Sequence, residues 1–260
     1  MLLNKRQPLF FIHIGKTAGV SLEHILNQHF PEKKICPYYY DLDFVDHAAE
    51  PLNYTLFYGH NWYYTLEVMP KNTQPITILR DPVKRLLSSY EHILRDRNHT
   101  HHQLINSNTQ SPVDFLEHDY IKKLFSNAHT RVLGTDYDLK GMLTKVANGG
   151  ISKEHAHAQL TEFRLNSQAD AAMLDRAKAR LREMPVFGLT EKFAESVQRI
   201  ASIMNISVDS IPHKNSAPKE THSKYQQYSQ QNIDALKRLN EFDIELYEFA
   251  DALFQERTPA

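Results

Sequence analysis

Four short apolar runs, each followed by a turn or a helical pattern, set the layout of the chain. Residues 9–14 are rich in aromatic and β-branched side chains, as in a strand that is covered on both faces. Further strands are expected at 54–60, 76–79 and 186–189. Their alternation with helices predicts a three-layer α/β/α fold with a central, largely parallel sheet. We expect a single domain over residues 1–260, because no biased linker divides the chain.

Apolar residues at helical spacing predict the intervening helices. One helix follows Gly19, and another begins at Pro82, where Asp81 is expected to cap the first turn. Thr190 is expected to cap the helix after the last strand. A polar stretch follows the break at Gly150. The remaining expectations are helices at 114–133, 171–183 and 233–254, the last broken near Asn240, and loops at 95–111 and 211–223.

The turn after the first strand carries the clearest candidate chemistry. Gly15 and Gly19 flank Lys16, so the backbone can bring several N–H groups close to a ligand at a helix N-terminus. Phe10 stands where the first glycine of a P-loop belongs, so the Walker A spacing is absent. The turn indicates a phosphate-type site with one fixed cation. The alternative is an ordinary strand, turn and helix with a surface lysine.

Polar residues also follow the second and third strands. His60 ends the second strand, and Arg80 ends the third, two helical turns before Ser88. Ligands of open α/β sheets collect at the carboxyl ends of strands. An arginine can bind a phosphate through two parallel hydrogen bonds, and a serine hydroxyl can add a third. The alternatives are a structural histidine and an arginine that pairs with Asp81.

Composition narrows the class of protein. The formal net charge is -1 over 260 residues, so no global field favours nucleic acid or a membrane surface, and a polyanion site has to be a local patch. The single cysteine, Cys36, excludes an internal disulfide framework. No run of about 20 apolar residues is present, and the first strand begins at about residue 9 without a preceding apolar stretch, so we expect no signal peptide. We expect a soluble, cytoplasmic protein without an integral membrane segment or a nucleic-acid partner.

A cluster of histidines at 99–102 raises the question of a metal site. His99, His101 and His102 are candidate ligands, but no carboxylate or cysteine completes a recognisable spacing. A polar loop is therefore the favoured interpretation, and no metal site is expected.

The opening turn, the FYGH segment at 57–60 and the ILRDPVKRLLSSY segment at 78–90 occur together in one order. In this the chain resembles the carbohydrate sulfotransferases that use 3′-phosphoadenosine 5′-phosphosulfate (PAPS), the group that includes the heparan sulfate O-sulfotransferases. Segments 187–193 and 243–249 are also similar to that family. The resemblance implies the P-loop NTPase-like sulfotransferase fold.

The resemblance also implies roles for residues of this chain. Lys16 and its turn would hold the 5′-phosphosulfate, Arg80 and Ser88 would hold the 3′-phosphate, and His60 would be the general base. Lys16 and His60 are thus the expected catalytic residues. Gly15 stands where the family commonly has proline, and Val20 where a threonine often assists, which removes one phosphate contact. The full expected cofactor set is Gly15, Lys16, Thr17, Ala18, Gly19, Val20, Ser21, Arg80 and Ser88.

The favoured function is transfer of the sulfuryl group from PAPS to a hydroxyl of a sugar or glycan, by an in-line reaction that requires no metal. The alternatives are a nucleotide kinase or NTPase of similar architecture and a non-catalytic nucleotide- or glycan-binding module. The sequence leaves open the acceptor, the position sulfated and the oligomeric state. Candidate acceptor contacts are Tyr38, Tyr39, Tyr40, Trp62 and Tyr63 for stacking, and Lys33, Lys34, Lys122 and Lys123 for anionic patches.

Overall fold

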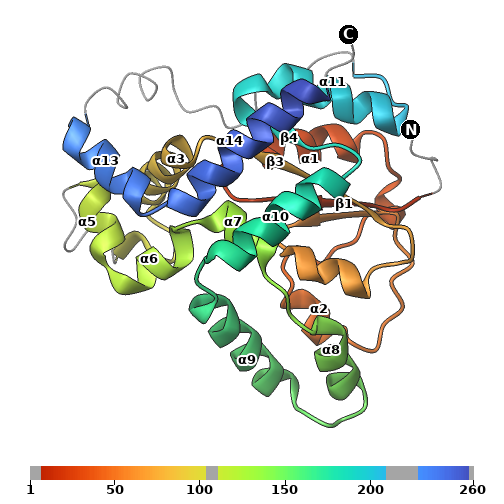
Figure 1. Ribbon diagram of the computed structural model, residues 1–260. Helices are drawn as coiled ribbons and strands as arrows, with labels where there is room; N and C mark the ends of the chain where they lie inside the picture. The colour runs from red at the N-terminus through yellow and green to blue at the C-terminus, as the bar shows by residue number, and fades with distance from the viewer. Residues whose placement is uncertain (1–6, 104–110, 209–227, 258–260) are drawn as a thin grey trace.

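The sheet is the frame on which the other elements are placed. The computed structural model describes residues 7–103, 111–208 and 228–257, and the statements below concern these residues. Within them, four parallel strands form a sheet in the order β2-β1-β3-β4 (Figure 1). The first, second and fourth strands are shorter than predicted. The strands are β1 (Leu9–Ile12), β2 (Leu56–Gly59), β3 (Gln74–Leu79) and β4 (Gly188–Leu189).

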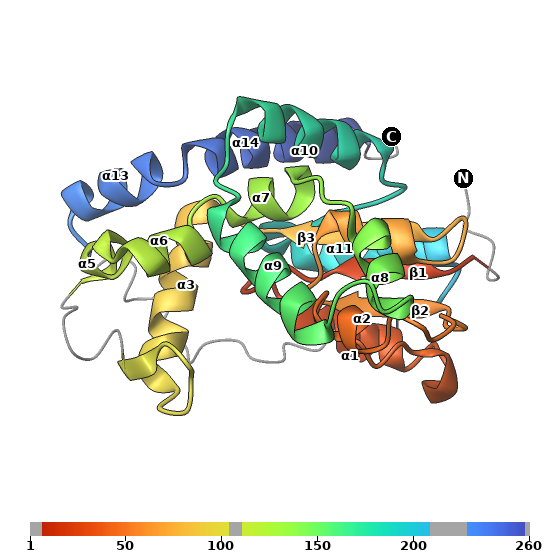
Figure 2. The same ribbon diagram turned by 90° about the horizontal axis from the view of Figure 1, so that it is seen from below.

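Side chains of β1 alternate between two apolar cores, which explains the unbroken apolar run in the sequence. Leu9 and Phe11 contact the core under α1 and α11, whereas Phe10 and Ile12 contact the core under α7, α10 and α14. Helices therefore cover both faces of the sheet, as Figures 1 and 2 show, and the predicted three-layer fold is confirmed. These helices are α1 (Gly19–Asn27), α7 (Ala128–Gly134), α10 (Ala171–Glu183), α11 (Phe193–Met204) and α14 (Glu241–Glu256).

Another group of helices lies beside the sheet at one end of the molecule (Figures 1 and 2). It has its own apolar cluster, which includes Leu86, Ile121 and Leu236. The first helix of the group starts as predicted, because an Asp81 carboxylate oxygen accepts from the Lys84 N–H at 2.8 Å. The group comprises α3 (Pro82–Arg95), α5 (Pro112–Glu117), α6 (Asp119–Phe125) and α13 (Gln230–Arg238).

One predicted helix was wrong, and one helix was missed. Residues 114–133 do not form one helix: α5, α6 and α7 occupy that region, and Asn127 precedes α7 in a left-handed conformation with φ 46°. The polar stretch after Gly150 contains α9 (Lys153–Asn166), which buries only Ala156 and Leu160 and so shows no apolar stripe. The helices α8 (Leu139–Ala147) and the short α2 (Asp43–Asp46) were not predicted either.

The C-terminal helical region breaks where it was expected to break. Asn240 separates α13 from α14 and lies buried between them. The predicted loop at 211–223 lies outside the described residues, as do residues 104–110 of the predicted loop at 95–111.

Thr190 does not cap a helix, contrary to the prediction. The helix α11 begins at Phe193, and no side chain caps its first turn. The hydroxyl of Thr190 instead donates to the carbonyl oxygens of Thr17 and Leu79, at 3.0 Å each. It therefore ties the end of β3 to the turn after β1.

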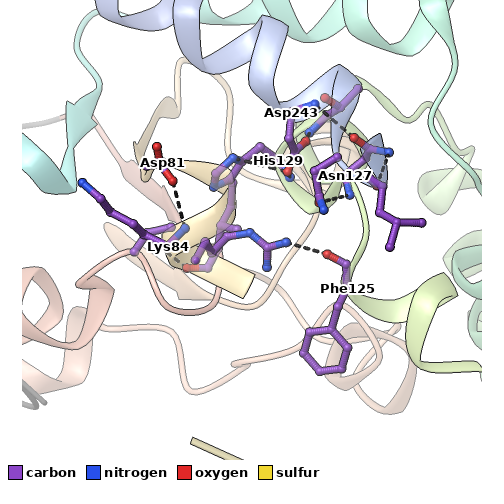
Figure 3. Close-up of polar contacts among 12 residues, drawn as sticks. Asp81, Lys84, Phe125, Asn127, His129 and Asp243 are labelled. Atoms are coloured by element: carbon purple, nitrogen blue, oxygen red, sulfur yellow. Dashed lines mark hydrogen bonds and ion pairs between the residues drawn. The ribbon is translucent and has the colours of Figure 1, made fainter. Parts of the chain in front are cut away.

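The start of α7 is anchored by α14 rather than by its own sequence. The Asp243 carboxylate accepts from the N–H groups of His129 at 3.0 Å and Thr130 at 2.8 Å, while the Asp243 N–H donates to the Asn127 side chain at 3.1 Å (Figure 3). All of these groups except Asn127 are buried. Asp243 thus supplies acceptors that α7 lacks, and fixes this helix against the sheet.

The strand order creates a topological switch point between β1 and β3, because the chain leaves these two neighbours toward opposite edges of the sheet. The turns after both strands meet there, at their carboxyl ends. Across the described residues, no helix is both long enough and apolar enough to cross a membrane.

Candidate functional site

One cavity of about 870 Å³ opens at the carboxyl ends of β1, β2 and β3. It brings together side chains from segments that are far apart in the sequence. All the predicted site residues line it except Thr17, and they are Gly15, Lys16, Ala18, Gly19, Val20, Ser21, His60, Arg80 and Ser88.

The wall of this cavity carries an excess of positive charge. Among the described residues, no aspartate or glutamate lines it, although the whole chain has a formal net charge of -1. Such a local field attracts an anionic ligand. The basic side chains of the wall are Lys16, Arg80, Arg85, Arg95, Arg131 and Arg164.

The turn after β1 has a conformation that gathers peptide N–H groups. Lys16 and Ala18 have positive φ angles of 69° and 65°. This left-handed region costs an L-residue about 1–2 kcal/mol, and residues of alternating hand form a concave nest that binds anions. The Thr17 hydroxyl, buried beneath the turn, donates to the Ile14 carbonyl at 2.7 Å. Thr17 therefore supports the turn from below and does not face the cavity with its side chain.

Lys16 of this turn lies next to Arg80, which follows β3. A guanidinium N–H of Arg80 donates to the Lys16 carbonyl at 3.0 Å, while the buried Nε of Arg80 has no hydrogen-bond partner in the structure. The pKa of Lys16 is lowered to about 8, first by burial and then by the charges of Arg95 and Arg80. A bound anion would offset both the desolvation and the repulsion, so these groups fit a phosphate-type ligand.

The two serines of α3 have different surroundings. The Ser89 hydroxyl donates to the Arg85 carbonyl within the helix, at 3.1 Å. Ser88 is half-buried at the cavity wall on the same helix that Arg80 precedes. Arg85 is fully buried and donates to the Phe125 carbonyl at 2.5 Å, a contact drawn in Figure 3. Arg80 and Ser88 therefore remain the pair that can hold an anion together.

His60 has one ring nitrogen engaged and one available. Its Nδ1–H donates to the His13 carbonyl at 2.7 Å, which leaves Nε2 as the unprotonated nitrogen of the neutral ring. Burial, followed by the neighbouring His13, lowers the pKa of His60 to about 4. His60 is therefore neutral at pH 7 and can accept a proton at the cavity wall.

Comparison with known proteins identifies the family. Residues 1–250 match the sequence profile described as "Sulfotransferase family". The chain belongs to the sulfotransferase family. The chain is 28% identical over 205 residues to heparan-sulfate 6-O-sulfotransferase 2 of Gallus gallus, a match that covers 72% of this chain and 45% of the relative. It is 27% identical over 207 residues to heparan-sulfate 6-O-sulfotransferase 1 of Homo sapiens, with 72% and 45% covered.

The chain thus spans about half the length of the curated relatives that it matches. Among solved structures, it is similar to mouse sulfotransferase SULT7A1 complexed with PAP, with a TM-score of 0.52 and 13% identity over 97% of this chain and 91% of that chain. This likeness confirms the sulfotransferase fold.

Several polar residues that line this cavity were not predicted from the sequence, among them His13, Arg131 and Arg164. His13 interrupts the first apolar run, and that interruption was the signal that could have revealed it. Arg131 lies on α7, in the region predicted as one long helix, and Arg164 lies on α9, which was not predicted. Arg164 forms a 2.7 Å ion pair with the buried Asp41, so one side of its guanidinium is already held by the protein.

The large apolar side chains that remain exposed among the described residues all line this cavity or its mouth. They are Val20 at 40%, Tyr40 at 48% and Tyr120 at 40% exposure. Tyr40 is therefore the predicted stacking residue with both an exposed ring and a place in the cavity. Trp62 also lines it but is buried, with the guanidinium groups of Arg131 and Arg164 over its ring at 5.5 and 5.1 Å.

Other predicted contacts lie elsewhere. Tyr38 is buried and donates to Glu50, and Tyr63 carries the Arg180 guanidinium over its ring. Lys123 lines a smaller hollow next to the cavity, whereas Lys33, Lys34 and Lys122 line neither. Of the histidine cluster, His99 lines the cavity, and the Nδ1–H of the buried His102 donates to the Ile93 carbonyl at 2.7 Å. No set of three metal-ligand side chains occurs in the described part of the chain.

Proposed function

We propose that the chain transfers the sulfuryl group of PAPS to a hydroxyl group of a carbohydrate. Membership of the sulfotransferase family supports this, as do the relatives named heparan-sulfate 6-O-sulfotransferases. The observation that carries the proposal is the basic cavity in which the turn around Lys16, the Arg80–Ser88 pair and His60 meet. It offers two anion-binding positions and one neutral base.

We assign one of these positions to the 5′-phosphosulfate of PAPS and the other to its 3′-phosphate. Lys16 and the peptide N–H groups of residues 15–21 hold the 5′-phosphosulfate at the N-terminus of α1, where the helix dipole also favours an anion. Arg80 and Ser88 hold the 3′-phosphate, which would use the unpartnered Nε of Arg80. These assignments place the required positive charge on the side chains of Lys16 and Arg80.

His60 is proposed as the general base. Its Nε2 accepts the proton of the acceptor hydroxyl while the hydroxyl oxygen bonds to sulfur and the bond from sulfur to the 5′-phosphate oxygen breaks. Lys16 and the N–H groups of the turn stabilise the charge that returns to this phosphate. The low pKa of His60 keeps the ring neutral before the reaction, and nearby anionic groups of PAPS would raise its affinity for a proton.

The acceptor path is proposed to run between α6 and α9. A hollow of about 590 Å³ on these helices shares Tyr120, Thr161 and Leu165 with the main cavity. Its continuity with the cavity suits an extended chain better than a small molecule. Arg131 and Arg164 lie in the cavity wall near this junction and can attract acidic groups on such a chain. A polysaccharide acceptor is therefore part of the proposal.

Calorimetry with PAP, the product nucleotide, and with Mg-ATP tests the cofactor assignment. We expect PAP to bind more tightly, because only a sulfotransferase site requires the 3′-phosphate. Arg80→Ala should weaken PAP binding by about 1.5–3 kcal/mol, the scale of a charged hydrogen bond. Lys84→Ala is the matched control, since Lys84 is exposed on the same helix and does not line the cavity.

A preference for Mg-ATP would replace this proposal with a nucleotide kinase or NTPase. Unchanged PAP affinity in Arg80→Ala would show that Arg80 does not hold the 3′-phosphate.

A further inference from the structure

Three polar side chains form a closed group behind His60. The Nδ1–H of His13 donates to a Glu23 carboxylate oxygen at 2.7 Å, and the Tyr39 hydroxyl donates to the same oxygen at 2.9 Å. The Tyr39 hydroxyl also lies 3.0 Å from His13 Nδ1. Because an ionised carboxylate can only accept hydrogen bonds, Glu23 fixes the orientation of both partners.

The group is shielded from water. The side chains of His13 and Glu23 keep 5% and 12% of their exposure. Burial, together with the charge of Glu23, raises the pKa of Tyr39, so its hydroxyl stays protonated and remains a donor. A carboxylate in such a place needs donors to offset its desolvation. His13 and Tyr39 provide them.

The same group holds His60 on two sides. The His60 Nδ1–H donates to the His13 carbonyl at 2.7 Å, and the two imidazole rings lie 4.5 Å apart between centroids. The ring of Tyr39 contacts His60 edge-on, with centroids 5.2 Å apart. Movement of His13 or Tyr39 would therefore change the direction in which His60 presents Nε2.

Gly15 and Gly19, in the turn after β1, also pack against these histidines. A Cβ atom at Gly19 would lie 2.0 Å from Cδ2 of His13, so the His13 ring occupies the space that a side chain would need. A Cβ atom at Gly15 would lie 3.9 Å from Cε1 of His60. The turn, His13 and His60 are thus in direct contact, and Glu23 joins them from the second turn of α1.

Glu23 also changes the electrostatics of His60. Its negative charge favours the protonated ring, whereas burial, His13 and Arg164 disfavour it. No other carboxylate is among the groups that shift the pKa of His60. The ionisable groups facing His60 are His13 after β1, Glu23 on α1, the phenols of Tyr39 and Tyr40, and Arg164 on α9.

We propose that Glu23 is a positioning residue of the reaction: through His13 and Tyr39 it holds His60 in one orientation, and its charge supports transfer of the acceptor proton to that ring. This inference rests on the proposed role of His60 as the base. Neither Glu23 nor Tyr39 lines the cavity, so both act through other residues.

The steady-state test uses Glu23→Gln, which keeps the size of the side chain and removes its charge. Turnover should fall by about tenfold to 100-fold, the scale expected when a reacting group is slightly misplaced. PAP affinity should stay close to the wild-type value, because removal of the negative charge of Glu23 does not weaken the binding of an anion. Glu32→Gln, an exposed acid near α1 in sequence, is the control and should behave as wild type. A parallel loss of PAP affinity and turnover would overturn the proposal in favour of a purely structural role for Glu23.

A second readout does not depend on turnover. The ¹⁵N spectrum of histidine-labelled protein at pH 7, with His60→Gln used for assignment, should show His60 in the Nδ1–H tautomer alone. In Glu23→Gln the same signal should report a mixture of tautomers. An unchanged His60 signal would contradict the proposal even if no acceptor were turned over, whereas absent turnover with the expected tautomer change would count against the proposed function only.

Discussion

At the scale of single residues, the ammonium group of Lys16 lies at the cavity wall among other cations. Its pKa falls to about 8 because burial removes water and because Arg95 and Arg80 repel its charge. The backbone at Lys16 also has a positive φ angle, which an L-residue rarely adopts. The surrounding structure therefore holds Lys16 in an unfavourable conformation as well as in a place that disfavours its charge. Such opposition between a group and its environment is typical of functional sites.

This environment predicts an alkaline limit for the reaction. In the free enzyme Lys16 is charged below its lowered pKa, so kcat/KM for PAPS should fall as the pH rises through about 8. The variant Lys16→Arg keeps its charge at all accessible pH values and should lose this alkaline limb, even if its rate is lower. The measurement is kcat/KM for PAPS between pH 6 and 10. The same alkaline limb in Lys16→Arg would assign the titration to another group.

At the scale of elements, the junction of α7 and α14 supports the cavity from behind. Arg131 and Val132 of α7 line the cavity, and Asp243 of α14 holds the first peptide groups of that helix (Figure 3). His129 beside it is buried, and its pKa is lowered to about 4 by this burial, so the ring is neutral at pH 7. Asp243 is therefore held mainly by peptide N–H donors.

Asp243→Ala should lower the free energy of unfolding by about 2–4 kcal/mol, because it leaves two buried N–H groups without an acceptor. Urea denaturation measures the change. Glu245→Ala is the matched control: this exposed acid of the same helix pairs with Lys178 and should cost less than about 1 kcal/mol. Equal effects of the two substitutions would show that the junction contributes little to stability.

The elements also show which parts of the fold can be predicted from local sequence patterns. Strands were found because an apolar run such as 9–14 reflects burial on both faces, and the start of α3 was found because Asp81 and Pro82 act locally. The helix α9 was missed because it buries two side chains only. The separate start of α7 was missed because the acceptors for its first N–H groups come from Asp243 in a distant segment. The part of the cavity built by these helices, including Arg131 and Arg164, could not be predicted from local spacing.

At the scale of the whole molecule, a nearly neutral chain presents a basic cavity. The formal net charge of -1 gave no indication of it, because acids are absent from the cavity lining and lie elsewhere. The predicted residues of the turn after β1, except Thr17, meet the more distant Arg80, Ser88 and His60 in that cavity, since the carboxyl ends of β1, β2 and β3 are adjacent. The single-domain organisation and the cytoplasmic location stay predictions.

Transfer of labelled sulfate from [³⁵S]PAPS to a polysaccharide tests the central claim most directly. The wild-type chain, incubated with heparan sulfate or with its desulfated form, should label the polysaccharide. His60→Ala should reduce the rate by roughly 10²–10⁴-fold, as expected for loss of a general base, and should still bind PAP. Binding of PAP without transfer to either polysaccharide by the wild-type chain, or equal transfer by His60→Ala, would contradict the account.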